Sequence, residues 1–145
     1  MRYRFIDKIT SLTLDGEPRI EVAKTFDAGD DAFSGPSGQA RVPESLLLEL
    51  MAMTGGHLVF RHVGGGRLPL LLKVAECRFE GGAAPDVALR AVAELGGVSA
   101  ISDDASVAEA STEVYAGEER LATGTLLYVC VRVPGVDLAA WEAAP

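Results

Sequence analysis

One segment of this chain is apolar almost all the way round a helix. Pro43 suits the first position of that helix because its missing N–H is not needed there. Glu44 follows with a negative charge, which the helix dipole favours. Leucine, methionine, valine and phenylalanine then dominate as far as Phe60, and Gly64–Gly66 ends the segment. A helix that is apolar on every side is buried, so we expect a fold built around this one helix.

Most of the remaining chain alternates apolar and polar residues with the period of a β-strand. The expected strands are Phe5–Leu14, Arg19–Phe26, Leu68–Phe79, Val87–Leu95, Ala108–Val114 and Leu121–Val133. Inward positions are predicted at Val87, Leu89, Ala91, Ala93, Leu95, Ala108, Ala110, Thr112 and Val114, and Leu127, Val129, Val131 and Val133 share one face. One helix wrapped by an antiparallel sheet is an α+β arrangement. We expect a single domain over residues 1–134 and a C-terminal tail over residues 135–145.

Charge and composition exclude several classes of protein. The 145 residues include 13 Lys and Arg against 21 Asp and Glu, a net charge of −8, which disfavours nucleic-acid binding and anionic membranes. The longest apolar run, Leu46–Phe60, is shorter than the ~20 residues of a membrane span. Cys77 and Cys130 lack metal-ligand spacing. We therefore predict a cytoplasmic protein with no metal, no cofactor and neither nucleic acid nor membrane as a partner.

Glu49 is the candidate catalytic residue. It is the only ionisable residue between Glu44 and His57, and its neighbours in the helix are almost all apolar. An unpaired buried carboxylate is costly, so such a group is protonated, hydrogen-bonded or placed beside a cavity. A desolvated carboxyl group suits general acid–base chemistry near neutral pH. The alternative is that Glu49 points out of a short exposed sector of the helix, or binds the backbone of a partner subunit.

Several short segments, taken in order, resemble the bacterial 3-hydroxyacyl-acyl-carrier-protein dehydratases. These segments are Tyr3–Ile9, Phe33–Gly35, Val42–Pro43, Leu46–Ala52 and Cys77–Phe79. The resemblance implies a hotdog fold, in which a curved antiparallel sheet wraps a long central helix. It also implies a dimer whose two sheets are continuous, with the acyl chain in a tunnel between the subunits.

The resemblance also implies a site. In that family a loop histidine and a helix acid act together across the dimer, and the helix acid corresponds to Glu49. Where the family has His-Phe-Pro-Gly, this chain has Pro-Ser-Gly-Gln over residues 36–39, so the missing histidine falls on Gly35 or Pro36. The residue whose N–H faces the thioester carbonyl corresponds to Glu44. The substrate-binding residues implied in this way are Gly35, Pro36, Val42, Pro43, Glu44 and Ser45.

Neither remaining histidine is predicted to replace the missing one. His57 lies about 12 Å along the helix axis from Glu49, at 1.5 Å per residue, which is too far for a direct pair within one chain. His62 lies near the helix end, where a cation favours the dipole. Both are interpreted as structural or surface residues.

Three functions are consistent with these residues. The first is a dehydratase-type protein with a degenerate site that handles acyl thioesters, with the non-catalytic half of a heterodimer as one form of it. The second is an acyl-thioester hydrolase in which Glu49 activates water. The third is a dimer that binds an acyl ligand without turnover. The expected partners are an acyl thioester on acyl carrier protein or coenzyme A, and a second hotdog subunit, identical or different.

Overall fold

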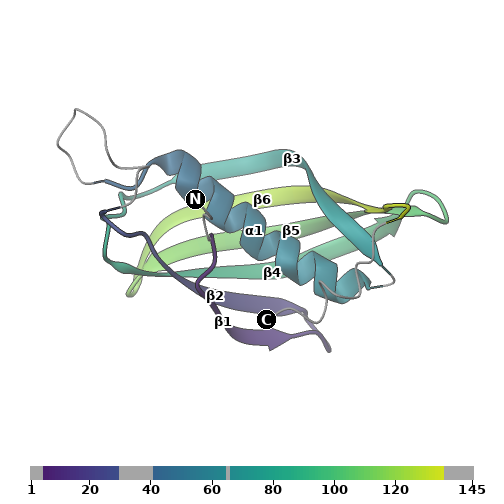
Figure 1. The fold of residues 1–145 in the computed structure, drawn as a ribbon, viewed down its shortest axis with the longest axis horizontal. Coiled ribbons are helices and arrows are strands. Elements are labelled where there is room, and N and C mark those ends of the chain that lie inside the picture. Colours follow the sequence, from purple (N-terminus) through teal and green to yellow (C-terminus); the bar gives the residue numbers. More distant parts are fainter. Residues whose placement is uncertain (1–4, 30–40, 65, 136–145) are drawn as a thin grey trace.

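The computed structural model describes residues 5–29, 41–64 and 66–135. In these ranges one long helix lies across a six-stranded antiparallel sheet (Figure 1). The elements are β1 (Lys8–Thr13), β2 (Arg19–Thr25), α1 (Glu44–Val63), β3 (Arg67–Phe79), β4 (Ala88–Ala100), β5 (Ala105–Ala116) and β6 (Glu119–Arg132). The predicted α+β arrangement of one helix and an antiparallel sheet is confirmed. Among the described helices, none is long and apolar enough to cross a bilayer.

The sheet has the strand order β1-β2-β4-β5-β6-β3. Chain neighbours pair in β1–β2, β4–β5 and β5–β6, whereas β3 crosses over to pair with the far side of β6. This crossover makes β3 an edge strand. The β3–β6 register shifts between Leu71 and Lys73, and again between Val74 and Glu76.

The hydrophobic core lies between α1 and the inner face of the sheet. The fully buried side chains of the helix include Leu47, Leu50, Met51, Leu58 and Val59. The helix begins after Pro43, whose carbonyl accepts hydrogen bonds from the N–H groups of Leu46 and Leu47 at 3.0 and 3.4 Å. It ends at Val63, and the next residue, Gly64, has a φ of 59°, which suits a residue without a side chain.

Two expectations about faces were wrong, the burial of α1 on every side and the inward position of Val87. The helix is buried on one face only, because the sheet covers one side and Ser45, Glu49 and Met53 face outward. On β6 the residues Leu127, Val129 and Val131 do share one face, and it is the outer one, because Leu126, Tyr128 and Cys130 point inward. That face is equally apolar, so the sequence pattern does not distinguish the two. Val87 is 41% exposed because it precedes β4.

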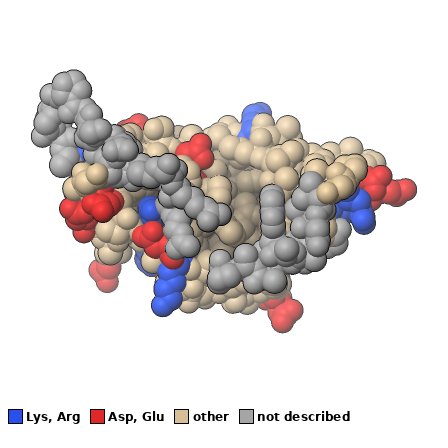
Figure 2. Space-filling model, viewed as in Figure 1, with Lys and Arg blue, Asp and Glu red and all other residues tan. Residues whose placement is uncertain are grey.

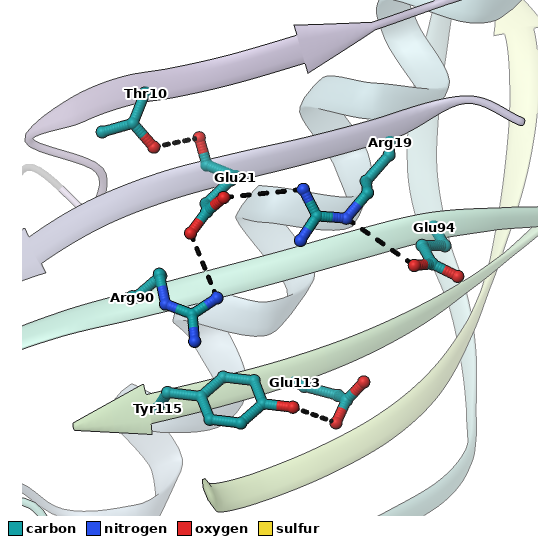
Figure 3. A network of polar contacts seen from close by, with 7 residues as sticks. All are labelled: Thr10, Arg19, Glu21, Arg90, Glu94, Glu113 and Tyr115. Atoms are coloured by element: carbon teal, nitrogen blue, oxygen red, sulfur yellow. Dashed lines mark hydrogen bonds and ion pairs between the residues drawn. The ribbon is translucent and has the colours of Figure 1, made fainter. Parts of the chain in front are cut away.

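The outer face of the sheet carries a network of polar side chains (Figure 3). Glu21 on β2 accepts hydrogen bonds from Arg19 and Arg90 at 3.5 and 3.1 Å. The guanidinium of Arg90 also lies 4.5 Å from the ring centre of Tyr115. These groups satisfy one another in solvent, so this part of the outer face is a solvated surface rather than a site.

Candidate functional site

A pocket of about 560 Å³ lies between the outward face of α1 and the edge strand β3. This volume is in the range of small-molecule sites. Its lining consists of Glu49, Ala52, Met53, Gly56, His57, Phe60 and Arg61 from α1, Leu68, Pro69 and Leu71 from β3, and Tyr128 from β6. The middle of this side of the molecule is largely uncharged, and most charged side chains lie toward its two ends (Figure 2). The pocket therefore suits an apolar ligand that also meets a few polar groups.

Glu49 lines this pocket, near the N-terminal end of α1. The sequence left open a desolvated carboxyl group or an exposed sector of the helix, and the side chain of Glu49 is exposed within the single chain. The reason is that α1 has an open face toward β3, and Glu49 lies on it. The alternative of an exposed helix sector is therefore correct for the isolated chain, and the carboxylate still borders a cavity.

His57 lines the same pocket, although its position in the sequence suggested a structural or surface residue. It is half-buried, and this burial together with the nearby Arg61 charge lowers the pKa of its imidazole. The ring is therefore neutral at pH 7 in the single chain. His62, by contrast, is exposed and is not part of the lining. A spacing of eight residues, which leaves both side chains on one side of the helix, was the available signal for His57.

Tyr128 lines the pocket from β6 and is hydrogen-bonded to α1. Its hydroxyl group donates a hydrogen bond of 2.6 Å to the backbone carbonyl of Ala52, and only 2% of the residue is exposed. Burial raises the pKa of Tyr128 well above its usual value, so the hydroxyl stays protonated and remains a donor. A Cβ atom on Gly55 would lie 2.5 Å from this hydroxyl oxygen. The close approach of Tyr128 therefore explains a glycine in the middle of α1.

The remaining predicted site residues lie elsewhere. Val42 is 2% exposed in the core, and its N–H donates to the carbonyl of Ala83 at 2.9 Å. Pro43, Glu44 and Ser45 are exposed at the start of α1, outside the pocket lining. Gly35 and Pro36 lie outside the described residues.

No protein-family profile matches the chain, and no curated protein sequence does. The fold of the chain does match solved structures. A hypothetical thioesterase from Streptococcus pneumoniae, determined with coenzyme A, superposes with a TM-score of 0.64 at 12% identity, covering 87% of this chain and 90% of that one. This is the hotdog fold.

Two further neighbours agree. A thioesterase superfamily member from Thermus thermophilus has a TM-score of 0.65 at 15% identity, with 90% of each chain covered. A variant of the fluoroacetyl-CoA-specific thioesterase, in complex with fluoroacetate and CoA, has a TM-score of 0.65 at 11% identity, covering 79% of this chain and 93% of that one. Identities this low establish the shared fold alone.

These neighbours correct part of the family interpretation. The expected hotdog fold is confirmed, whereas the resemblance to dehydratases finds no support, because the named neighbours are thioesterases.

Proposed function

We propose that this protein hydrolyses acyl thioesters, with Glu49 as the general base. The observation that carries the proposal is the position of Glu49, a carboxylate on an otherwise mostly apolar pocket between α1 and β3. The hotdog neighbours support it, because they are described as thioesterases and two of them hold coenzyme A. The acyl group occupies the apolar pocket and the thioester carbonyl lies near Glu49. The carrier is then coenzyme A, with acyl carrier protein as the alternative.

The proposed reaction is general-base hydrolysis. The carboxylate of Glu49 takes a proton from a water molecule while the water oxygen bonds to the thioester carbonyl carbon. Collapse of the tetrahedral intermediate breaks the carbon–sulfur bond, and the sulfur leaves with the bonding electrons. The proton held by Glu49 then passes to the departing sulfur, so the products are a carboxylic acid and a thiol and the carboxylate of Glu49 is restored. Removing a positioned acid–base group of this kind typically lowers the rate about 10²–10⁴-fold.

The test is a panel of acyl-CoA and acyl-carrier-protein thioesters assayed for two products. Release of free thiol that depends on Glu49 supports the hydrolase. Formation of an enoyl thioester from 3-hydroxyacyl substrates would instead support the dehydratase-type alternative, and we expect none from the protein alone because the loop lacks the family's histidine. Binding of acyl thioester without either product would support the non-enzymatic dimer.

We also propose that the working form is a dimer joined at β3. This strand lies at the sheet edge, and no second strand of the described residues pairs with it; such edges are normally covered or protected. Leu70, Leu71 and Leu72 on it are 46%, 47% and 58% exposed. The other edge, β1, has only six residues and exposes no comparable run of leucines. Pairing of β3 with a second copy would cover both the leucines and the open side of the pocket.

A further inference from the structure

The pocket between α1 and β3 carries opposite charges toward its two ends. Glu49 lines it near the start of α1, whereas His57 and Arg61 line it from the C-terminal half of the helix. At 1.5 Å per residue, His57 lies about 12 Å and Arg61 about 18 Å from Glu49 along the helix axis. Among the described lining residues, Arg61 is the only one with a permanent positive charge. The pocket therefore has an acidic end and a basic end.

The stretch between these two ends is lined mainly by hydrocarbon. Strand β3 follows α1 directly and packs beside it in the opposite direction; burial and the nearby Glu44 charge raise the pKa of the Cys77 thiol at the far end of the strand. Leu68 and Pro69 therefore lie beside the C-terminal part of α1, and Leu71 lies further toward Glu49. The apolar residues that the helix adds to the lining are Ala52, Met53, Gly56 and Phe60.

Arg61 and His57 lie close together at the basic end. They are four residues apart, a spacing that places two helix side chains side by side, and burial together with the Arg61 charge lowers the pKa of His57. Both residues are half-buried. Hydrocarbon placed against a half-buried guanidinium removes water from the charge, which costs free energy. A carboxylate would instead accept paired hydrogen bonds from the guanidinium, whose donors match its two oxygens.

We infer that the preferred acyl group ends in a second carboxylate, which binds Arg61 and the imidazole N–H of His57 at the basic end of the pocket. This inference rests on the proposed hydrolase function, because it places the thioester carbonyl near Glu49. The substrates are then monothioesters of α,ω-dicarboxylic acids. Addition of water across the carbon–sulfur bond releases the free dicarboxylic acid and the thiol.

The separation of the two ends sets the length of the acyl chain. Carbon–carbon bonds of about 1.52 Å at angles of about 111° advance an extended chain by about 1.25 Å per carbon. Side chains on a helix lean toward its N-terminus, so the long Arg61 side chain can reach back toward the level of His57. A span of about 12 Å, with a hydrogen bond at its end, corresponds to an acyl chain of about eight to ten carbons.

Binding to Glu49→Gln tests the inference, because this variant should hold a substrate without hydrolysing it. By calorimetry we expect suberyl-CoA to bind about tenfold more tightly than octanoyl-CoA, as one charged hydrogen bond provides. Sebacyl-CoA should show the same preference over decanoyl-CoA, whereas adipyl-CoA is too short to show it over hexanoyl-CoA. Octanoyl-CoA that binds as tightly as suberyl-CoA, or more tightly, would overturn the inference.

Variants of Arg61 distinguish the acyl group from the carrier. In the same Glu49→Gln background, Arg61→Met removes the charge and should abolish the preference for suberyl-CoA, whereas Arg61→Lys should keep part of it. A loss of affinity that is equal for octanoyl-CoA and suberyl-CoA would place Arg61 against the phosphates of coenzyme A and overturn the inference. Arg78→Met, at an exposed arginine of β3 outside the pocket lining, is the matched control and should keep the preference.

Turnover and binding test the two proposals separately. If the wild-type protein releases no thiol from any thioester, the proposed hydrolase fails, and the binding preference still decides the inference. If the protein does hydrolyse thioesters, kcat/KM should be about tenfold higher for suberyl-CoA than for octanoyl-CoA, and this ratio should be lost in Arg61→Met. Hydrolysis that favours octanoyl-CoA in both proteins would leave the hydrolase in place and overturn the second carboxylate.

Discussion

Glu49 is exposed on the open face of α1, in contact with the pocket and away from the core. Replacing Glu49 by Gln should therefore change the free energy of unfolding by no more than about 0.5 kcal/mol, as for other surface positions. The same variant should lose about 10²–10⁴-fold in thioester hydrolysis. Urea denaturation and a free-thiol assay measure the two effects. A loss of stability of about 1–3 kcal/mol with turnover intact would indicate a structural hydrogen bond instead.

Gly55 and Gly56 are adjacent in α1 but should respond oppositely to alanine. In an open helix, alanine is more stable than glycine by about 1 kcal/mol. At Gly55 the added Cβ would lie 2.5 Å from the Tyr128 hydroxyl oxygen and 3.3 Å from the Cβ of Ala110, whereas at Gly56 the nearest atom is 3.6 Å away. We expect Gly55→Ala to destabilise the protein by about 1–3 kcal/mol, the usual range for overpacking.

Gly56→Ala is the matched control, and thermal denaturation of both variants measures the difference. We expect Gly56→Ala to be neutral or to stabilise the protein by up to about 1 kcal/mol. Equal changes in stability at the two positions would show that Tyr128 does not limit the space for a Cβ atom at Gly55. Combining Gly55→Ala with Tyr128→Phe, which removes the hydroxyl group, should recover part of the loss.

Elements were easier to predict than the faces that they present. The helix and the strands were placed within a few residues of their observed ends, except that β4 continues to Ala100 and β5 begins at Ala105. The alternation is interrupted there because the β4–β5 register shifts between Leu95 and Gly97. Sequence alone does not show that β3 crosses over to an edge, so the open face of α1 beside it was also missed.

The edge strand β3 should control the oligomeric state. Leu72 is 58% exposed and lies at the register shift between Leu71 and Lys73. A lysine there is a common way to prevent edge pairing, so we expect Leu72→Lys to shift the protein from dimer to monomer. Ile101→Lys, at a position that is 63% exposed between β4 and β5, is the matched control and should remain dimeric.

Light scattering at micromolar concentration measures both variants. A monomeric wild-type protein would contradict the proposed dimer. A Leu72→Lys variant that stays dimeric would place the interface on another surface.

At the scale of the whole molecule, the sequence indicates one residue of the candidate site but not which residues lie together around the pocket. Glu49 was proposed as a catalytic residue because a charge among apolar residues is conspicuous in a sequence, and it does line the pocket. His57 was set aside because a distance measured along one helix excludes a direct pair within that chain, but both residues line the same pocket. Which residues face each other across a subunit boundary depends on symmetry, and a sequence carries no direct signal of symmetry.

The whole fold should also be sensitive to alkaline pH, and Tyr128 is the reason. Burial raises the pKa of this residue above the ordinary value of 10.0, so the folded protein keeps a proton that the unfolded chain releases near pH 10. The associated stability is complete below pH 10 and is lost as the pH rises above it. One such proton corresponds to a slope of about 1.4 kcal/mol per pH unit. The free energy of unfolding can be measured with urea between pH 9 and 11, both roughly one unit from that ordinary value. Its decrease with pH should steepen toward this slope in the wild type, and the contribution should be missing in Tyr128→Phe.

Because the hydrogen bond from Tyr128 to Ala52 joins β6 to α1, loss of the Tyr128 proton at high pH affects the helix and the sheet together. Among the described residues of the hydrophobic core, only Tyr128 and Cys130 carry a side-chain proton that base can remove, and the phenol of Tyr128 is a donor only while it keeps its proton. As base removes that proton, a negative oxygen faces the carbonyl oxygen of Ala52, and attraction becomes repulsion at the middle of α1. Alkaline inactivation should therefore begin with the separation of α1 from β6, and the tyrosinate absorbance of Tyr128 should rise together with the loss of the pocket.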